Sequence, residues 1–292
     1  MLRHILAFEG RLLLRNGVFW IVLAVFGLIG FTAMASENVS FGGGVGNILR
    51  NAPAVVIALL GGFSVLSVLL STIFVAGIAL RDFEQRTGEL FFSTPLRRRD
   101  YLLGRFGGGF LASLAIMLAA AAGLWLGSLM PWLDQERLGP TPWAAFAWSF
   151  AVLVVPNLLF LSALQFLLAV ATRSMLHTYI GAIAFLVLWT ASGSLVSDLD
   201  SRWIGALVDP SGGNAFSEHI RYWSAAQYNS QLPELGGLLL GNRLLWLGMA
   251  VLLLVLAFRL FRTDREGLVL RRRKADAGAA APAAAHPTSR RD

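Results

Sequence analysis

The chain has 292 residues, of which 56% are hydrophobic and only 14% are charged, and its formal net charge is +7. Soluble domains carry about 25% charged residues, so this composition excludes a soluble globular protein and, outside the C-terminal tail, a disordered chain. Cysteine is absent, which excludes disulfides and thiolate metal sites. Lys274 is the only lysine and no glycine-rich loop precedes it. Without the GxxxxGK[ST] motif, the sequence predicts no nucleotide hydrolysis by this chain itself.

Residues 1–17 predict an amphipathic helix that lies in the cytoplasmic membrane interface. Arg3, Arg11 and Arg15 share one stripe of this helix, and leucine and isoleucine residues share another. The apolar run that follows ends in residues 33–35, Ala-Met-Ala, which resemble a signal-peptidase site. That run is longer than the usual signal-peptide core of roughly 7–15 residues. We therefore interpret it as the first transmembrane span.

Six apolar runs are long enough to cross about 30 Å of hydrocarbon as helices. They comprise residues 18–35, 54–80, 106–130, 143–171, 179–197 and 244–261. None of the 17 acidic residues lies within a run. Pro156 is expected to kink the fourth helix rather than end it. Together the runs predict an all-α membrane protein with a six-span domain over residues 18–265.

The basic residues are distributed unevenly between the two sides of these spans. Nineteen of the 24 Lys and Arg residues fall on the side that carries both termini. The positive-inside bias therefore places both termini in the cytoplasm, and the basic composition needs no nucleic-acid partner. Residues 266–292 form a basic, low-complexity tail that we expect to be disordered.

Residues 82–94, between the second and third spans, predict a short charged helix in the cytoplasm. One face of it carries Phe83, Thr87, Leu90 and Phe91. The remaining positions carry the charged residues Asp82, Glu84, Arg86 and Glu89, and Pro95 ends the helix. Such a helix could lie on the lipid surface or dock into a groove of a protein. An anionic leaflet favours an almost wholly basic polar face, so the acidic residues favour the protein groove.

Residues 198–243 form the longest segment on the outer side. Within it, residues 203–208 and 216–223 could form short helices at the outer interface, where Trp and Tyr side chains prefer to lie. The segment is either an ordinary loop with interfacial aromatic residues or a segment with a role in gating. Both interpretations stay open at this point.

Residues 81–105 carry the most recognisable stretch of the chain. An acidic residue and a glycine are followed by Ser93-Thr94-Pro95, basic residues and Tyr101-Leu102-Leu103-Gly104. This stretch and the layout of the spans resemble a permease of the ABC-2 class of ATP-binding-cassette transporters. The resemblance is greatest to the N-terminal membrane half of bacterial permeases fused to an M1-type aminopeptidase domain. No HExxH motif is present, so peptidase activity is not carried over.

The resemblance implies an N-terminal interfacial helix, a cytoplasmic coupling helix and an outer helical segment between the fifth and sixth spans. It also implies a permease subunit of an ATP-driven exporter in the bacterial inner membrane. Its partners would be separate ABC ATPase subunits, a second copy or a second six-span half, and membrane lipid. The residues expected to contact the ATPase are Asp82, Phe83, Glu84, Arg86, Thr87, Glu89, Leu90 and Phe91.

We expect no enzymatic activity, cofactor or metal in this chain. Its four histidines, His4, His177, His219 and His286, are scattered without metal-ligand spacing, and the nucleophile motifs GxSxG and SxxK are absent. A six-span anchor or scaffold that organises a partner without transport is the alternative function.

Overall fold

A computed structural model describes residues 2–36, 47–84, 98–196 and 201–261. Within these ranges every regular element is a helix. Six helices in the described part are long and apolar enough to cross a membrane: Gly17–Ala35, Pro53–Arg81, Arg98–Gly127, Trp143–Thr172, Met175–Val196 and Gly237–Leu260. The predicted six-span, all-α fold is confirmed, and the protein is a multi-span helical membrane protein.

Two of the six spans are built from several helical segments. The second contains α3 (Pro53–Val65), α4 (Ser67–Leu70), the π-helix η1 (Ser71–Ala76) and α5 (Gly77–Glu84). The fourth contains α8 (Trp143–Ser149), the π-helix η3 (Phe150–Val154) and α9 (Val155–Thr172). The other spans are α2 (Gly17–Ala35), α7 (Arg98–Gly127), α10 (Met175–Val196) and α14 (Gly237–Leu260).

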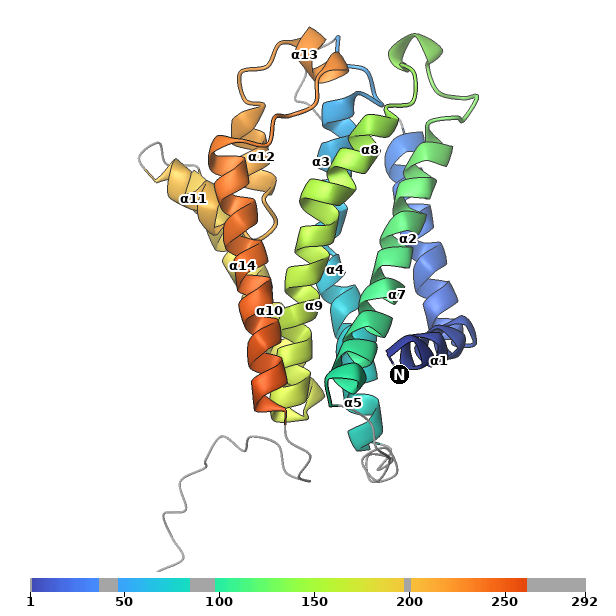
Figure 1. Cartoon of the computed structure of the whole chain (residues 1–292). Helices are drawn as coiled ribbons and strands as arrows, with labels where there is room; N and C mark the ends of the chain where they lie inside the picture. The colour runs from blue at the N-terminus through green and yellow to red at the C-terminus, as the bar shows by residue number, and fades with distance from the viewer. Residues whose placement is uncertain (1, 37–46, 85–97, 197–200, 262–292) are drawn as a thin grey trace, which may run out of the picture.

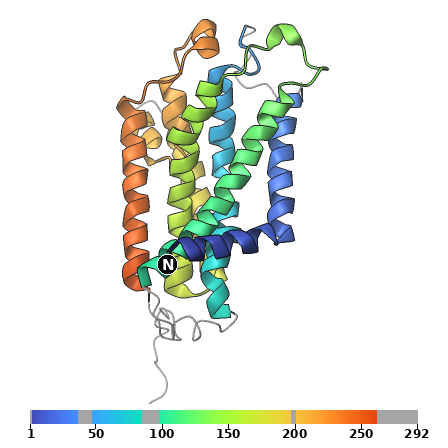
Figure 2. The same cartoon turned by 45° about the vertical axis from the view of Figure 1, so that its right-hand side comes forward.

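The shorter helices lie at the two ends of the bundle (Figure 1). Helix α1 (Leu2–Leu14) lies across one end, where the last turn of α14 also lies (Figure 2). Helices α11 (Arg202–Val208), α12 (Gly213–His219) and α13 (Ala225–Ser230) lie toward the opposite end, as does the short 3-10 helix η2 (Gln135–Arg137). We refer to these as the α1 end and the α13 end.

Several helices extend beyond the apolar runs that predicted them. Helix α7 begins at Arg98 rather than at residue 106, and α14 begins at Gly237 rather than at residue 244. The added turns contain Arg105 and Arg243, both of which are buried and paired with polar side chains. A prediction from hydropathy ends a span at the first charged residue. The helix itself can continue through a charged residue whose side chain is paired with a polar partner.

Helix α5 continues past the second span, which ends at Arg81, and ends at Glu84. The coupling helix is predicted to begin at Asp82, whereas residues 82–84 form the last turn of α5. The rest of the predicted coupling helix, residues 85–94, lies outside the described residues.

The second and fourth spans lie in the middle of the bundle, where most of their residues are buried, whereas only 17–22% of the residues in the apolar stretches of α2, α10 and α14 are buried. Helices α2 and α7 form a close pair. A Cβ atom on Gly123 would overlap the carbonyl of Gly27, and one on Gly30 would overlap that of Ala120. Small residues therefore let the two backbones touch, as they commonly do in membranes.

Pro156 lies in the first turn of α9, directly after η3. Proline has no N–H to donate within a helix, and the π-helical turn accommodates the irregularity without ending the span. The expectation that Pro156 does not end the fourth helix is confirmed.

Candidate functional site

Helix α1 is seated on glycines of α7. A Cβ on Gly104 would overlap the side chain of Ile5, and one on Gly108 would lie 2.8 Å from Cβ of Glu9. These two glycines form a GxxxG spacing, which exposes backbone on one face of a helix. The apolar stripe of α1 thus packs against the third span.

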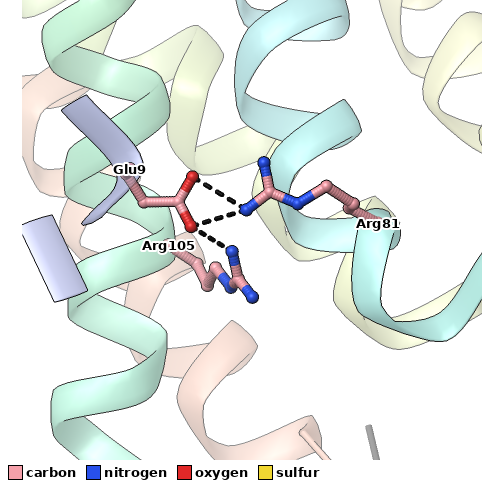
Figure 3. Close-up of polar contacts among 3 residues, drawn as sticks. All are labelled: Glu9, Arg81 and Arg105. Atoms are coloured by element: carbon pink, nitrogen blue, oxygen red, sulfur yellow. Dashed lines mark hydrogen bonds and ion pairs between the residues drawn. The ribbon is translucent and has the colours of Figure 1, made fainter. Parts of the chain in front are cut away.

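Glu9 is completely buried beneath this seat, and two arginines converge on its carboxylate (Figure 3). Nη2 of Arg81 donates to Oε1 at 2.7 Å and to Oε2 at 2.9 Å. Nη1 of Arg105 donates to the same Oε1. We call these three residues the Glu9 cluster. It joins α1, α5 and α7 through one carboxylate.

The two arginine side chains of the Glu9 cluster differ in their exposure to water. The side chain of Arg105 is 3% exposed and that of Arg81 is 21% exposed. The Arg105 guanidinium also lies 5.4 Å from the ring centre of Tyr101, a cation–π contact. Breaking a buried ion pair by removing one partner costs roughly 3–5 kcal/mol, because the remaining charge loses its compensation.

The cluster brackets the segment that the sequence singled out. Arg81 directly precedes residues 82–94, and Arg105 follows them. Nη2 of Arg98, at the start of α7, donates to the carbonyl of Phe258 at 3.1 Å and also to that of Phe261. A cation at a helix C-terminus is favoured by the helix dipole, so Arg98 ties the beginning of α7 to the end of α14. Both sides of the segment are therefore anchored in the bundle.

The eight predicted ATPase-contacting residues fall partly within the described chain. Asp82, Phe83 and Glu84 have helical backbone in the last turn of α5. The other five, Arg86, Thr87, Glu89, Leu90 and Phe91, lie outside the described residues. Their proposed contacts stay a prediction.

Sequence reasoning missed Glu9, although a signal was present. It is the only acidic residue of α1, and it stands four positions after Ile5 and four before Leu13, on the apolar stripe. A charge on the apolar face of an amphipathic helix has to find a buried partner or stay solvated. Arg81 and Arg105, which directly flank the second and third apolar runs, offered such partners.

A second buried polar cluster lies toward the α13 end and centres on Asn157 of α9. Its Nδ2 donates to Oγ of Ser64 at 2.7 Å and to the carbonyl of Ser211 at 2.8 Å. Its Oδ1 accepts from Nη1 of Arg243 at 2.7 Å. The side chain of Asn157 thereby joins the second, fourth and sixth spans to the segment between α11 and α12.

Asn242, next to Arg243 on α14, holds the end of α11. Its Nδ2 lies 2.7–3.0 Å from the carbonyl oxygens of Ala206, Leu207 and Asp209, and its Oδ1 accepts from Nε of Arg243 at 2.9 Å. The last carbonyls of a helix have no partner within it, so Asn242 acts as a C-terminal cap supplied by another helix.

The start of α12 is fixed in a complementary way by Asp209, which is completely buried. Its carboxylate accepts from the backbone N–H of Ser211 at 2.9 Å and from that of Asn214 at 2.8 Å. An anion at a helix N-terminus satisfies free N–H groups. The short helices predicted within residues 198–243 are present as α11 and α12, and a role in gating stays a prediction. The second helix lies at Gly213–His219 rather than at residues 216–223.

Comparison of the sequence with models of known protein families found no match, and a search of curated proteins found none either.

Proposed function

We propose that the chain is the transmembrane permease subunit of an ABC-2 type exporter, which moves a substrate across a bacterial inner membrane. The observation that supports this proposal is the convergence of Arg81 and Arg105 on Glu9. These arginines flank the predicted coupling segment, so a force on that segment reaches α1, α5 and α7 through a buried ion pair.

The α1 end is the cytoplasmic end in this proposal. The basic residues predicted to face the cytoplasm include Arg3 and Arg11 of α1 and Arg15 directly after it, and the positive-inside bias places such residues in the cytoplasm. A cytoplasmic ATPase could then reach residues 82–94. The Arg98 contact with α14 would carry its movement to the sixth span as well.

Energy for transport would come from separate ATPase subunits. The only lysine of the sequence, Lys274, stands in a basic tail without the glycines of a phosphate-binding loop. The spans also contain no aspartate or glutamate in their apolar runs, whereas proton-coupled transport normally uses an ionisable residue in the membrane. Both observations favour an external ATPase over self-powered transport.

A second copy or a second six-span half would complete the transporter. Helix α10 offers a long apolar face for lipid or for such a partner, since Ile180, Ile183 and Val187 are 54%, 60% and 59% exposed. We propose that this exposed surface includes the subunit contact.

The test is whether the chain controls ATP hydrolysis by a partner. The tagged chain is purified from its own host, the co-purifying P-loop ATPase is identified, and both are reconstituted in vesicles. A permease changes the ATPase rate, and Arg81→Gln weakens this effect while the exposed Arg99→Gln does not. A scaffold would also bind the ATPase, but the rate of ATP hydrolysis would then be the same with wild type and with Arg81→Gln. That result, or the absence of any ATPase partner, would reject the proposal.

A further inference from the structure

A cavity of about 430 Å³ lies at the α1 end, between α1 and the second span. Its volume is within the range of small-molecule sites, roughly 300–1,000 Å³. One side is formed by the turn between α1 and α2, with Arg15 and Asn16. The other is formed by η1 and α5, with Ile73, Ile78 and Arg81. The wall of the cavity is polar at Arg15, Asn16 and Arg81 and apolar at Ile73 and Ile78.

The polar part of the wall is positively charged. Arg15 is exposed, and in the described part of the chain no carboxylate lies within ion-pair distance of it. Arg81 donates to the carboxylate of Glu9 through its Nη2, and its side chain stays 21% exposed. Asn16 caps the N-terminus of α2, where its Oδ1 accepts from the N–H of Val18. That helix end adds a partial positive charge.

The apolar part of the wall opens toward the membrane. Ile73 is 46% exposed on the outside of the second span, and Leu12 of α1 is 38% exposed. Helix α1 lies across the ends of the spans (Figure 2), which puts the polar part at the depth of lipid headgroups. Trp20, 48% exposed, lies close by with its Nε1 bonded to the carbonyl of Leu14, and tryptophan prefers this depth.

We propose that this cavity binds one anionic phospholipid from the leaflet at the α1 end. The phosphate lies between Arg15 and Arg81 near the N-terminus of α2, and an acyl chain lies along Ile73 and Ile78. A zwitterionic lipid offers the same chains but no net negative charge to the two guanidinium groups. The inference concerns lipid contact and does not depend on the proposed transport role.

Native mass spectrometry of the full chain, released from detergent, tests this proposal with phosphatidylglycerol, phosphatidylcholine of the same acyl chains, and inorganic phosphate. We expect one phosphatidylglycerol to bind about fivefold more tightly than phosphatidylcholine. One basic residue near an anionic headgroup contributes about that much. Inorganic phosphate, which has no chain for the apolar wall, is expected not to displace the lipid.

Two pairs of variants locate the site. Arg15→Gln is expected to weaken phosphatidylglycerol binding about fivefold, while Arg11→Gln, one turn earlier on α1 and outside the cavity, leaves it unchanged. Ile73→Trp fills the cavity and lowers the occupancy of either lipid. Leu69→Trp, one turn away on the same exposed side of the second span, does not. All four positions are exposed or partly exposed, and unchanged melting temperatures establish that the variants fold.

Three results would overturn the proposal. Equal affinity for the two lipids would show that charge does not select the occupant. Equal losses in Arg11→Gln and Arg15→Gln would show diffuse attraction to the surface. Displacement of phosphatidylglycerol by inorganic phosphate would assign the site to a free anion.

Discussion

Glu9 and Arg105, which are 96 residues apart in the chain, form an ion pair in which both side chains are buried. The pair fastens a helix that lies across the membrane surface to one that crosses the membrane. Arg81 uses the same carboxylate. Removal of Glu9 therefore leaves two guanidinium groups without their shared counter-charge, one of them almost fully buried.

Glu9→Gln is expected to lower the free energy of unfolding by about 3 kcal/mol, the lower bound for breaking a buried pair. The matched control is Arg11→Gln, because Arg11 is an exposed residue of the same helix and its loss should change stability by less than about 0.5 kcal/mol. The stability of both variants is measured by thermal unfolding in detergent, with size-exclusion chromatography as the readout of the folded fraction. Equal melting temperatures for the two variants would show that the pair contributes nothing.

The predicted coupling segment is tested by Phe91→Ala and Glu84→Lys. If the segment docks into an ATPase, each change should cost about 1–3 kcal/mol of association, the range of an aromatic anchor or a reversed charge pair. Pull-down of the ATPase at equal membrane levels is the measurement.

The control for that experiment is Tyr222→Ala, which alters a residue 87% exposed near the α13 end. It should leave ATPase recovery unchanged. Undiminished recovery with both segment variants would reject docking, and stronger binding of Glu84→Lys to anionic vesicles would favour the lipid-surface alternative.

Gly212 precedes α12 with a φ of +71°, and a Cβ there would overlap the guanidinium of Arg243. Gly212→Ala combines left-handed backbone strain, about 1–2 kcal/mol, with displacement of Arg243 from Asn157. We expect a loss of stability larger than the strain alone. Gly248→Ala is the control, since no atom lies within 4 Å of its Cβ position and alanine favours the helix. A Gly212→Ala protein as stable as Gly248→Ala would contradict this account.

Asn157 and Gln165 provide a matched comparison on α9. Asn157 contacts Ser64, Ser211 and Arg243, whereas neither polar atom of the buried Gln165 side chain has a partner within the described residues. Asn157→Leu should cost about 1–3 kcal/mol, because it leaves buried groups unsatisfied. Gln165→Leu should be neutral or stabilising, because it removes an unsatisfied group. The melting temperatures of the two variants are compared. A lower melting temperature for Gln165→Leu than for Asn157→Leu would refute this assignment of partners.

The absence of cysteine from the sequence permits a clean test of orientation. A membrane-impermeant maleimide added to intact cells should label Tyr222→Cys, near the α13 end. It should label Arg11→Cys, on the exposed side of α1, only after permeabilisation. The opposite pattern would reverse the proposed topology.

The spans were predictable because each is specified locally. A run of apolar residues is unfavourable in water wherever its neighbours lie, so hydropathy finds α2 or α10 without knowledge of the bundle. The seat of α1 is specified only in part by sequence, since the Gly104–Gly108 spacing favours close helix packing without identifying the partner helix.

The two polar clusters were not predictable in the same way. Arg243 read as an outer-loop residue, because its partner Asn157 is 86 positions away in the chain. Glu9 likewise depends on α5 and α7 being side by side. Such pairs depend on tertiary contacts, and a charge at the edge of an apolar run looks the same in sequence whether it is solvated or buried.

In the π-helical segments η1 and η3, each backbone hydrogen bond spans five residues instead of the four of the surrounding α-helix. Such a turn arises when a single residue is inserted into an existing helix, and removing one residue reverses it. A one-residue deletion within Phe150–Val154 should therefore leave the two halves of the fourth span in their present rotational register. The same deletion elsewhere in that span would turn one half by about 100° relative to the other. It would carry Asn157 away from Arg243. The second and fourth spans thus each contain a segment from which one residue can be removed without rotating one half of the span relative to the other.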